Sequence, residues 1–228
     1  MMNASLLMHM KTCAALLILS LPLVAIAAAP DISGKELGGG GALVFAKPGD
    51  GGRSYLRTLR ADFATGSFQA EVTITLKGGG GPGCAFFGLG CGQENPGASH
   101  EPSTAPSVYV RLAPGDFAGG VVTTSANGQE SVSGLAPVGD GTHRARLIWD
   151  AAGKRALFEI DTNWDGQSFQ VDWTGTVSAG GVAFGDAGHR FVGGANGVRF
   201  ADFSVKAASP AQIQAVGFAA TFPNSSKQ

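Results

Sequence analysis

The most suggestive chemistry in this sequence lies in one acidic stretch, residues 161–172. Asp161, Asn163 and Asp165 recur at alternate positions, Gly166 permits a sharp turn, and Asp172 stands where a closing carboxylate completes a calcium loop. The flanks are strand-like rather than helical, so the competing interpretation is a hairpin turn whose polar side chains bond their own backbone. The stretch therefore predicts either a calcium-binding rim loop or a polar turn.

The same stretch predicts a sugar-binding surface. Trp164 stands at the expected turn, where an exposed ring can stack on the apolar face of a sugar while Asp161 and Asn163 bond its hydroxyl groups. Arg144 and Arg146 share one face of a nearby strand and could add donors, although a solvated sheet surface would explain both equally well. We expect these residues to form a carbohydrate-binding site.

The elements that must position these residues are short strands. Of 228 residues, 36 are glycine and 11 are proline, which disfavours long helices, while 44% hydrophobic and 14% charged residues disfavour disorder. Turn signals about every ten residues are typical of an all-β sandwich or barrel. The predicted strands are 68–77, 108–112, 121–125, 142–149, 155–161, 168–174 and 197–206, the last with a bulge near Ala201 and Asp202. Residues 211–222 fit either a further strand or a helical turn.

Two segments carry a family resemblance. One runs through the predicted hairpin at 149–161 and follows a His-x-x-x-Leu strand (His143 to Leu147), and the other holds a Gly-Gly turn and a closing Phe-x-Val at 191–205. Residues 62–206 thus resemble the concanavalin-A-like lectin/glucanase superfamily, and within it the LamG-like modules of secreted bacterial proteins. The resemblance implies an antiparallel two-sheet β-sandwich of jelly-roll type. It also implies sugar at the rim or concave sheet, and in some members calcium at a rim loop.

The glucanase branch of that superfamily carries Glu-x-Asp-x-x-Glu on one strand. Glu159 and Asp161 match its first two acids, but Trp164 stands in the third position, which removes the general acid from the arrangement. The sequence therefore favours a non-catalytic module that binds a polysaccharide. Two alternatives remain open: an atypical glycoside hydrolase that uses Glu159 and Asp161, and a cell-envelope module that presents its loops to another protein.

The first residues predict export. Lys11 precedes an apolar run at 14–29 that ends in small residues, so cleavage after Ala27 fits a signal peptide, and the run is short of the ~20 residues of a membrane span. We expect a signal peptide at 1–27 and N-terminal strands with a glycine-rich loop at 28–61. The jelly-roll core follows at 62–206, and a C-terminal strand or tail at 207–228. The mature chain would be secreted or periplasmic and would have no membrane span.

Cysteine and charge complete the expectations. Cys84 and Cys91 would pair as a disulfide in an oxidising compartment, since zinc would need further ligands that the sequence does not supply. With 16 Lys and Arg against 17 Asp and Glu, and no basic run, we expect no nucleic-acid partner.

Overall fold

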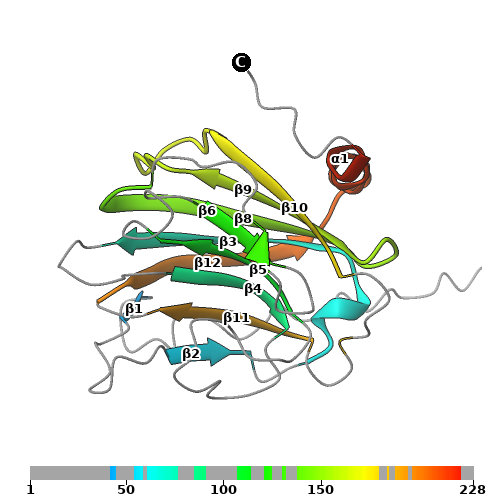
Figure 1. The fold of residues 1–228 in the computed structure, drawn as a ribbon, viewed down its shortest axis with the longest axis horizontal. Coiled ribbons are helices and arrows are strands. Elements are labelled where there is room, and N and C mark those ends of the chain that lie inside the picture. The colour runs from blue at the N-terminus through cyan, green and yellow to red at the C-terminus, as the bar shows by residue number, and fades with distance from the viewer. Residues whose placement is uncertain are drawn as a thin grey trace, which may run out of the picture.

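The computed structural model describes residues 42–44, 54–58, 61–76, 85–90, 107–113, 121–124, 130–131, 138–179, 184, 188–194 and 197–221. Within them, twelve strands form two six-stranded antiparallel sheets that pack face to face, and one α-helix lies beside them (Figure 1). The predicted all-β sandwich is confirmed. Each sheet joins strands that are far apart in sequence, so neither can form from one local segment.

Sheet A contains the strands that position the candidate site. Its order is β1 (Ala42–Val44), β12 (Arg199–Ala207), β3 (Phe68–Leu76), β8 (Gly141–Asp150), β9 (Arg155–Asp161) and β10 (Trp173–Ser178). Sheet B runs β2 (Ser54–Arg57), β11 (His189–Gly194), β4 (Ala85–Gly90), β5 (Val108–Leu112), β6 (Val121–Thr124) and β7 (Glu130–Ser131). A 3-10 turn, η1 (Phe63–Thr65), precedes β3.

The core fills the space between the sheets because strand side chains alternate between faces. Strand β3 turns Phe68, Ala70, Val72, Ile74 and Leu76 inward, as its sequence alternation predicts. The residues between them, which point outward, are all polar: Gln69, Glu71, Thr73 and Thr75. One face of sheet A is therefore committed to the core, which leaves its outer face for polar side chains.

Strand β12 contains the predicted bulge. Its register with β3 shifts between Ala201 and Ser204, and Asp202 has a φ of 52°. Phe200 is fully buried before the bulge, while Phe203 and Val205 pack against the core after it. The extra residue brings both sets of apolar side chains to the same face, and aspartate is among the residues that tolerate this left-handed conformation.

The C-terminal segment is helical rather than a strand. Helix α1 (Pro210–Thr221) begins with proline in its first turn and with a reciprocal cap between Ser209 and Gln212. Val216 of α1 packs on Ile148 and Leu157, which belong to the outer face of β8 and β9. The helix therefore covers the end of sheet A near the β8–β9 hairpin (Figure 1).

Two other predictions of strand position need correction. The predicted strand 168–174 is mostly loop, and β10 begins only at Trp173. The Gly-Gly sequence at 193–194 belongs to strand β11 rather than to a turn. Strand β4 was not predicted at all, because Gly88 and Gly90 obscure its alternation.

Cys84 and Cys91, the predicted disulfide pair, lie outside the described residues. The strand between them, β4, pairs with both β11 and β5.

A buried arginine, Arg190 of β11, carries an energetic cost. Its side chain is 2% exposed, its guanidinium lies 5.7 Å from the ring centroid of Phe63, and its Nε has no hydrogen-bond partner among the described residues. Burial lowers the pKa of Arg190 from its ordinary value to about 10. Because the pKa of a cation falls when its charged form is disfavoured, the charged side chain opposes folding at neutral pH by about 3 kcal/mol.

Replacing Arg190 with methionine is therefore expected to leave the midpoint of thermal unfolding at pH 7 unchanged or to raise it, since a buried ion is exchanged for an apolar side chain of similar length. Arg199→Met, which removes an exposed arginine on β12, is the matched control and should have little effect. A clear drop in the midpoint for Arg190→Met alone would contradict this account and show that the guanidinium has an anionic partner.

Candidate functional site

A row of polar positions crosses the outer face of sheet A. Strand register places side by side, from β12 to β10, Ser204, Glu71, Arg146, Glu159 and Thr174. We call this row the polar ladder. It arises because each of these strands has committed its alternate residues to the core, so that the remaining positions meet on the opposite face.

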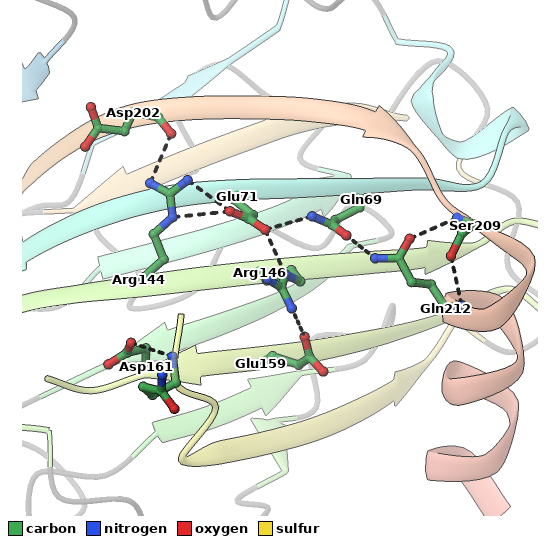
Figure 2. Close-up of polar contacts among 10 residues, drawn as sticks. Gln69, Glu71, Arg144, Arg146, Glu159, Asp161, Asp202, Ser209 and Gln212 are labelled. Atoms are coloured by element: carbon green, nitrogen blue, oxygen red, sulfur yellow. Dashed lines mark hydrogen bonds and ion pairs between the residues drawn. The ribbon is translucent and has the colours of Figure 1, made fainter. Parts of the chain in front are cut away.

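Glu71 is the centre of the polar ladder (Figure 2). Its Oε1 accepts hydrogen bonds from Arg146 Nε at 2.8 Å and from Gln69 Nε2 at 2.7 Å. Its Oε2 accepts from Nε and Nη2 of Arg144, at 3.3 and 3.0 Å. Arg146 continues the row by donating from Nη1 to Glu159 Oε2 at 2.8 Å. Two arginines and two glutamates thus form one connected network.

The network keeps its charges. Burial acts to raise the pKa of Glu71, but hydrogen bonds from Arg146 and Arg144 and their positive charges outweigh it and hold that pKa below its usual value. Burial likewise acts to lower the pKa of Arg146, and its bonds to Glu71 and Glu159 raise it instead. Glu71 and Arg146 therefore remain ionised at neutral pH.

Two aromatic rings lie over the arginines of this network. Arg144 Cζ is 5.5 Å from the ring centroid of Trp164, and Arg146 Cζ is 4.0 Å from that of Phe169. Both rings come from residues 162–172, the loop between β9 and β10, and Trp164 N anchors that loop by donating to Thr142 O at 3.0 Å. The faces of the guanidinium groups are covered by rings, while their edges bond the carboxylates.

Acidic side chains hold the β9–β10 loop in shape. Asp161 accepts hydrogen bonds from the backbone N of Asn163 at 3.0 Å and of Gln170 at 2.9 Å, one on each oxygen. Asp172 Oδ2 accepts from both N and Oγ1 of Thr162, at 3.0 and 2.7 Å. Asp165 Oδ1 accepts from the backbone N of Gln167 at 2.8 Å in the same way.

These contacts do not fit the calcium interpretation. In a calcium loop the oxygens of Asp161, Asn163, Asp165 and Asp172 would converge on one ion. Here each carboxylate faces backbone N–H groups, and in the part of the chain that the structure describes no three acidic, histidine or cysteine side chains are grouped to hold a metal ion. The loop has the alternative form, a turn whose polar side chains bond its own backbone.

The structure brings only part of the predicted sugar site together. Arg144, Arg146 and Trp164 form one cluster on sheet A. Asp161 is 3% exposed and serves the loop backbone. Asn163 is exposed, and its side chain donates to Thr162 Oγ1 at 3.3 Å. Sequence reasoning missed Glu71 and Phe169, although the polar face of the predicted strand 68–77 had marked Glu71 as outward-facing.

Glu159 and Asp161 lie on the same face of β9, as the hydrolase alternative requires, but they have separate tasks. Asp161 closes the loop with both of its oxygens, and Glu159 is paired with Arg146. The two carboxylates therefore do not stand free on either side of one reacting bond, which is how glycosidases use such a pair.

No protein-family model and no curated protein sequence matches the chain. Solved structures that resemble it include carbohydrate-binding module CBM66 from Bacillus subtilis, at 14% identity over 73% of this chain and 96% of that chain, with a TM-score of 0.42. The exoplasmic/lumenal domain of VIP36, bound to Ca2+ and Man3GlcNAc, is 12% identical over 68% and 75%, with a TM-score of 0.49. Basic winged bean lectin with Tn-antigen is 13% identical over 74% and 87%, with a TM-score of 0.43. At these identities the likeness concerns the fold alone.

Because the loop oxygens are occupied by backbone donors, removal of calcium is expected to leave the protein unchanged. The midpoint of thermal unfolding should be the same with EDTA and with excess calcium, whereas an ion bound only to the folded state would raise it. Magnesium added after EDTA treatment is the control for general ionic effects. A midpoint that rises with calcium alone would contradict the contacts described for Asp161 and Asp172.

Glu71→Gln is expected to lower the free energy of unfolding at pH 7 by about 1–3 kcal/mol, because it removes the carboxylate that Arg144 bonds and one of the two that Arg146 bonds. A carboxyl whose pKa is lowered by folding stabilises the fold above its unfolded pKa, and this contribution is lost as pH falls through the folded pKa. The difference between wild type and variant should therefore shrink as pH falls below 4.5, the ordinary value for this group. Urea unfolding across acidic and neutral pH measures it, and a difference independent of pH would overturn the assignment.

Proposed function

We propose that this chain is an exported carbohydrate-binding module that holds a glycan on the outer face of sheet A, at the polar ladder beside Trp164. The observation that carries the proposal is the pairing of two aromatic rings with two arginines whose orientation is fixed by glutamates. Carbohydrate recognition needs apolar ring surface together with planar hydrogen-bonding groups in fixed positions.

The supporting contacts act mainly by holding the side chains in place before a ligand arrives. Arg144 is tied to Glu71 and to Thr73 Oγ1, the latter at 2.7 Å, so its long side chain has already lost its rotamer freedom. Arg146 is tied at both sides of its guanidinium group. Binding to such side chains avoids an ordering cost of about 0.5–1.5 kcal/mol each.

Export is part of the proposal and rests on the sequence of residues 1–27, which lie outside the described residues. We place the N-terminal strands and glycine-rich loop at 28–61, the jelly-roll core at 62–206 and a C-terminal tail, which contains helix α1, at 207–228. No helix in the described portion is both long enough and apolar enough to cross a membrane. Secretion and retention in a periplasm both agree with this arrangement.

Trp164→Ala is expected to weaken binding to a polysaccharide ligand by about tenfold, the equivalent of one lost aromatic contact of about 1.4 kcal/mol. Affinity electrophoresis against a panel of soluble polysaccharides, followed by calorimetry with any that bind, would measure the loss. Phe218→Ala is the matched control, because Phe218 is an exposed aromatic residue, 65% accessible, on helix α1 and is not part of the ladder or of the β9–β10 loop.

The control variant should bind as the wild type does, and both variants should retain the wild-type circular dichroism spectrum. A folded wild-type protein that binds no polysaccharide at millimolar concentration would refute the proposed function. That result would favour the protein-interaction class of module over a glycan-binding one.

A further inference from the structure

The two halves of the polar ladder differ in how much hydrogen-bonding capacity they retain. Each oxygen of Glu71 already accepts two hydrogen bonds, which fills a carboxylate. Arg144 is similarly occupied: Nε and Nη2 donate to Glu71, and Nη1 donates to Thr73 Oγ1 and to the backbone O of Asp202. This half of the ladder is closed and has little left to offer a ligand.

The half that faces β10 is open. Glu159 uses Oε2 for Arg146 at 2.8 Å, and its Oε1 has no hydrogen-bond partner among the described residues. Arg146 donates from Nε and Nη1, so both N–H groups of Nη2 remain. Thr174, exposed on β10, stands directly opposite Glu159 in register. One acceptor, a pair of donors and a hydroxyl therefore meet at this end.

Phe169 decides from which direction a ligand can use these groups. Its ring lies 4.0 Å from Arg146 Cζ and covers a face of the guanidinium group. A guanidinium donates its hydrogen bonds in its own plane, so the covered face does not block Nη2. A ligand must therefore approach Arg146 in the plane of its guanidinium group. Glu159 is bonded to that group through Oε2, so its Oε1 lies close to the same approach.

The charges of the ladder and of Arg144 beside it limit what that ligand can be. Arg144, Arg146, Glu71 and Glu159 together sum to zero, and each arginine already faces a carboxylate at 3.0 Å or less. A ligand carboxylate or sulfate at Arg146 would stand beside Glu159, and an ammonium at Glu159 would stand beside Arg146. A ligand hydroxyl group is uncharged, so neither Glu159 nor Arg146 repels it. It can donate a hydrogen bond to the carboxylate or accept one from the guanidinium group.

We infer that the open end of the ladder binds an uncharged sugar, with one hydroxyl donating to Glu159 Oε1 and the neighbouring hydroxyl accepting from Arg146 Nη2. Glu159 is then the residue that sets specificity for neutral over anionic glycans. The inference rests on the proposed function, because it names the ligand class of the same surface.

The test compares binding of neutral polysaccharides (laminarin, galactomannan and dextran) with anionic ones (alginate and polygalacturonate). The wild type is expected to bind a neutral member and neither anionic one. Glu159→Gln should lose affinity for the neutral member by at least about tenfold, since it removes a charged acceptor. It should also gain salt-sensitive binding to the anionic polysaccharides, because Arg146 loses one of its two counter-ions.

Asp202→Asn is the matched control. It changes the net charge equally on strand β12, which β3 and β8 separate from β9. Asparagine tolerates the positive φ of 52° at that position, and the backbone O that Arg144 bonds is retained. If Asp202→Asn reproduces the effects of Glu159→Gln, the local role of Glu159 is overturned. A wild type that prefers alginate or polygalacturonate overturns the inference while the proposed function stands, and a wild type that binds none of the five refutes the proposed function itself.

Discussion

The outer face of sheet A depends on one carboxylate placed between two arginines. Glu71 stands on β3, where β8 is one neighbour and β12 the other, so its contacts join the strands at the centre of the sheet. A partly buried arginine without an acceptor would be costly, and two arginines one above the other on β8 would repel. Glu71 resolves both problems by bonding Arg144 and Arg146 at once. The position of both aromatic rings follows, because each ring lies on a guanidinium that Glu71 has already oriented.

The β9–β10 loop shows how the same residue types can serve different chemistry. Spacing alone made Asp161, Asp165 and Asp172 look like metal ligands, but a loop between paired strands has backbone N–H groups turned inward that need acceptors. The carboxylates satisfy those donors, as the contacts of Asp161 with Asn163 and Gln170 show. The acidic side chains thus fix the loop that carries Trp164 and Phe169, and their contribution to the site is indirect.

Sequence reasoning succeeded where local alternation decides the structure. The inward set of β3, the β8–β9 hairpin and the bulge in β12 all follow from apolar spacing along one segment. It failed where tertiary packing decides. Gly88 suggests a turn, yet it lies inside β4, where a Cβ would come within 2.6 Å of Tyr109 Cβ on β5 and glycine is therefore required. Glu71 was visible as a polar outward residue, but its partners depend on strand order, which no local pattern contains.

Helix α1 explains why the row of residues beside the polar ladder on the outer face of sheet A is largely apolar. The row of sheet A next to the ladder places Gln69, Ile148 and Leu157 side by side, and the two apolar members would be exposed without Val216 of the helix. The helix is tied to the ladder as well as to this apolar row. Gln212, which caps α1 together with Ser209, donates to Gln69, and Gln69 in turn donates to Glu71 (Figure 2).

This chain of contacts makes the closed half of the ladder the anchored half. Glu71 receives bonds from the helix side through Gln69 and from β8 through both arginines, whereas Glu159 receives one bond and stands beside β10 at the edge of the sheet. A carboxylate held by many hydrogen bonds is fixed in place but cannot accept further bonds from a ligand. A carboxylate held by one hydrogen bond is oriented and can still accept others. The division of labour along the ladder therefore follows from where α1 and the sheet edge lie, and it places ligand contact at Glu159 and Arg146 rather than at the more strongly bonded Glu71.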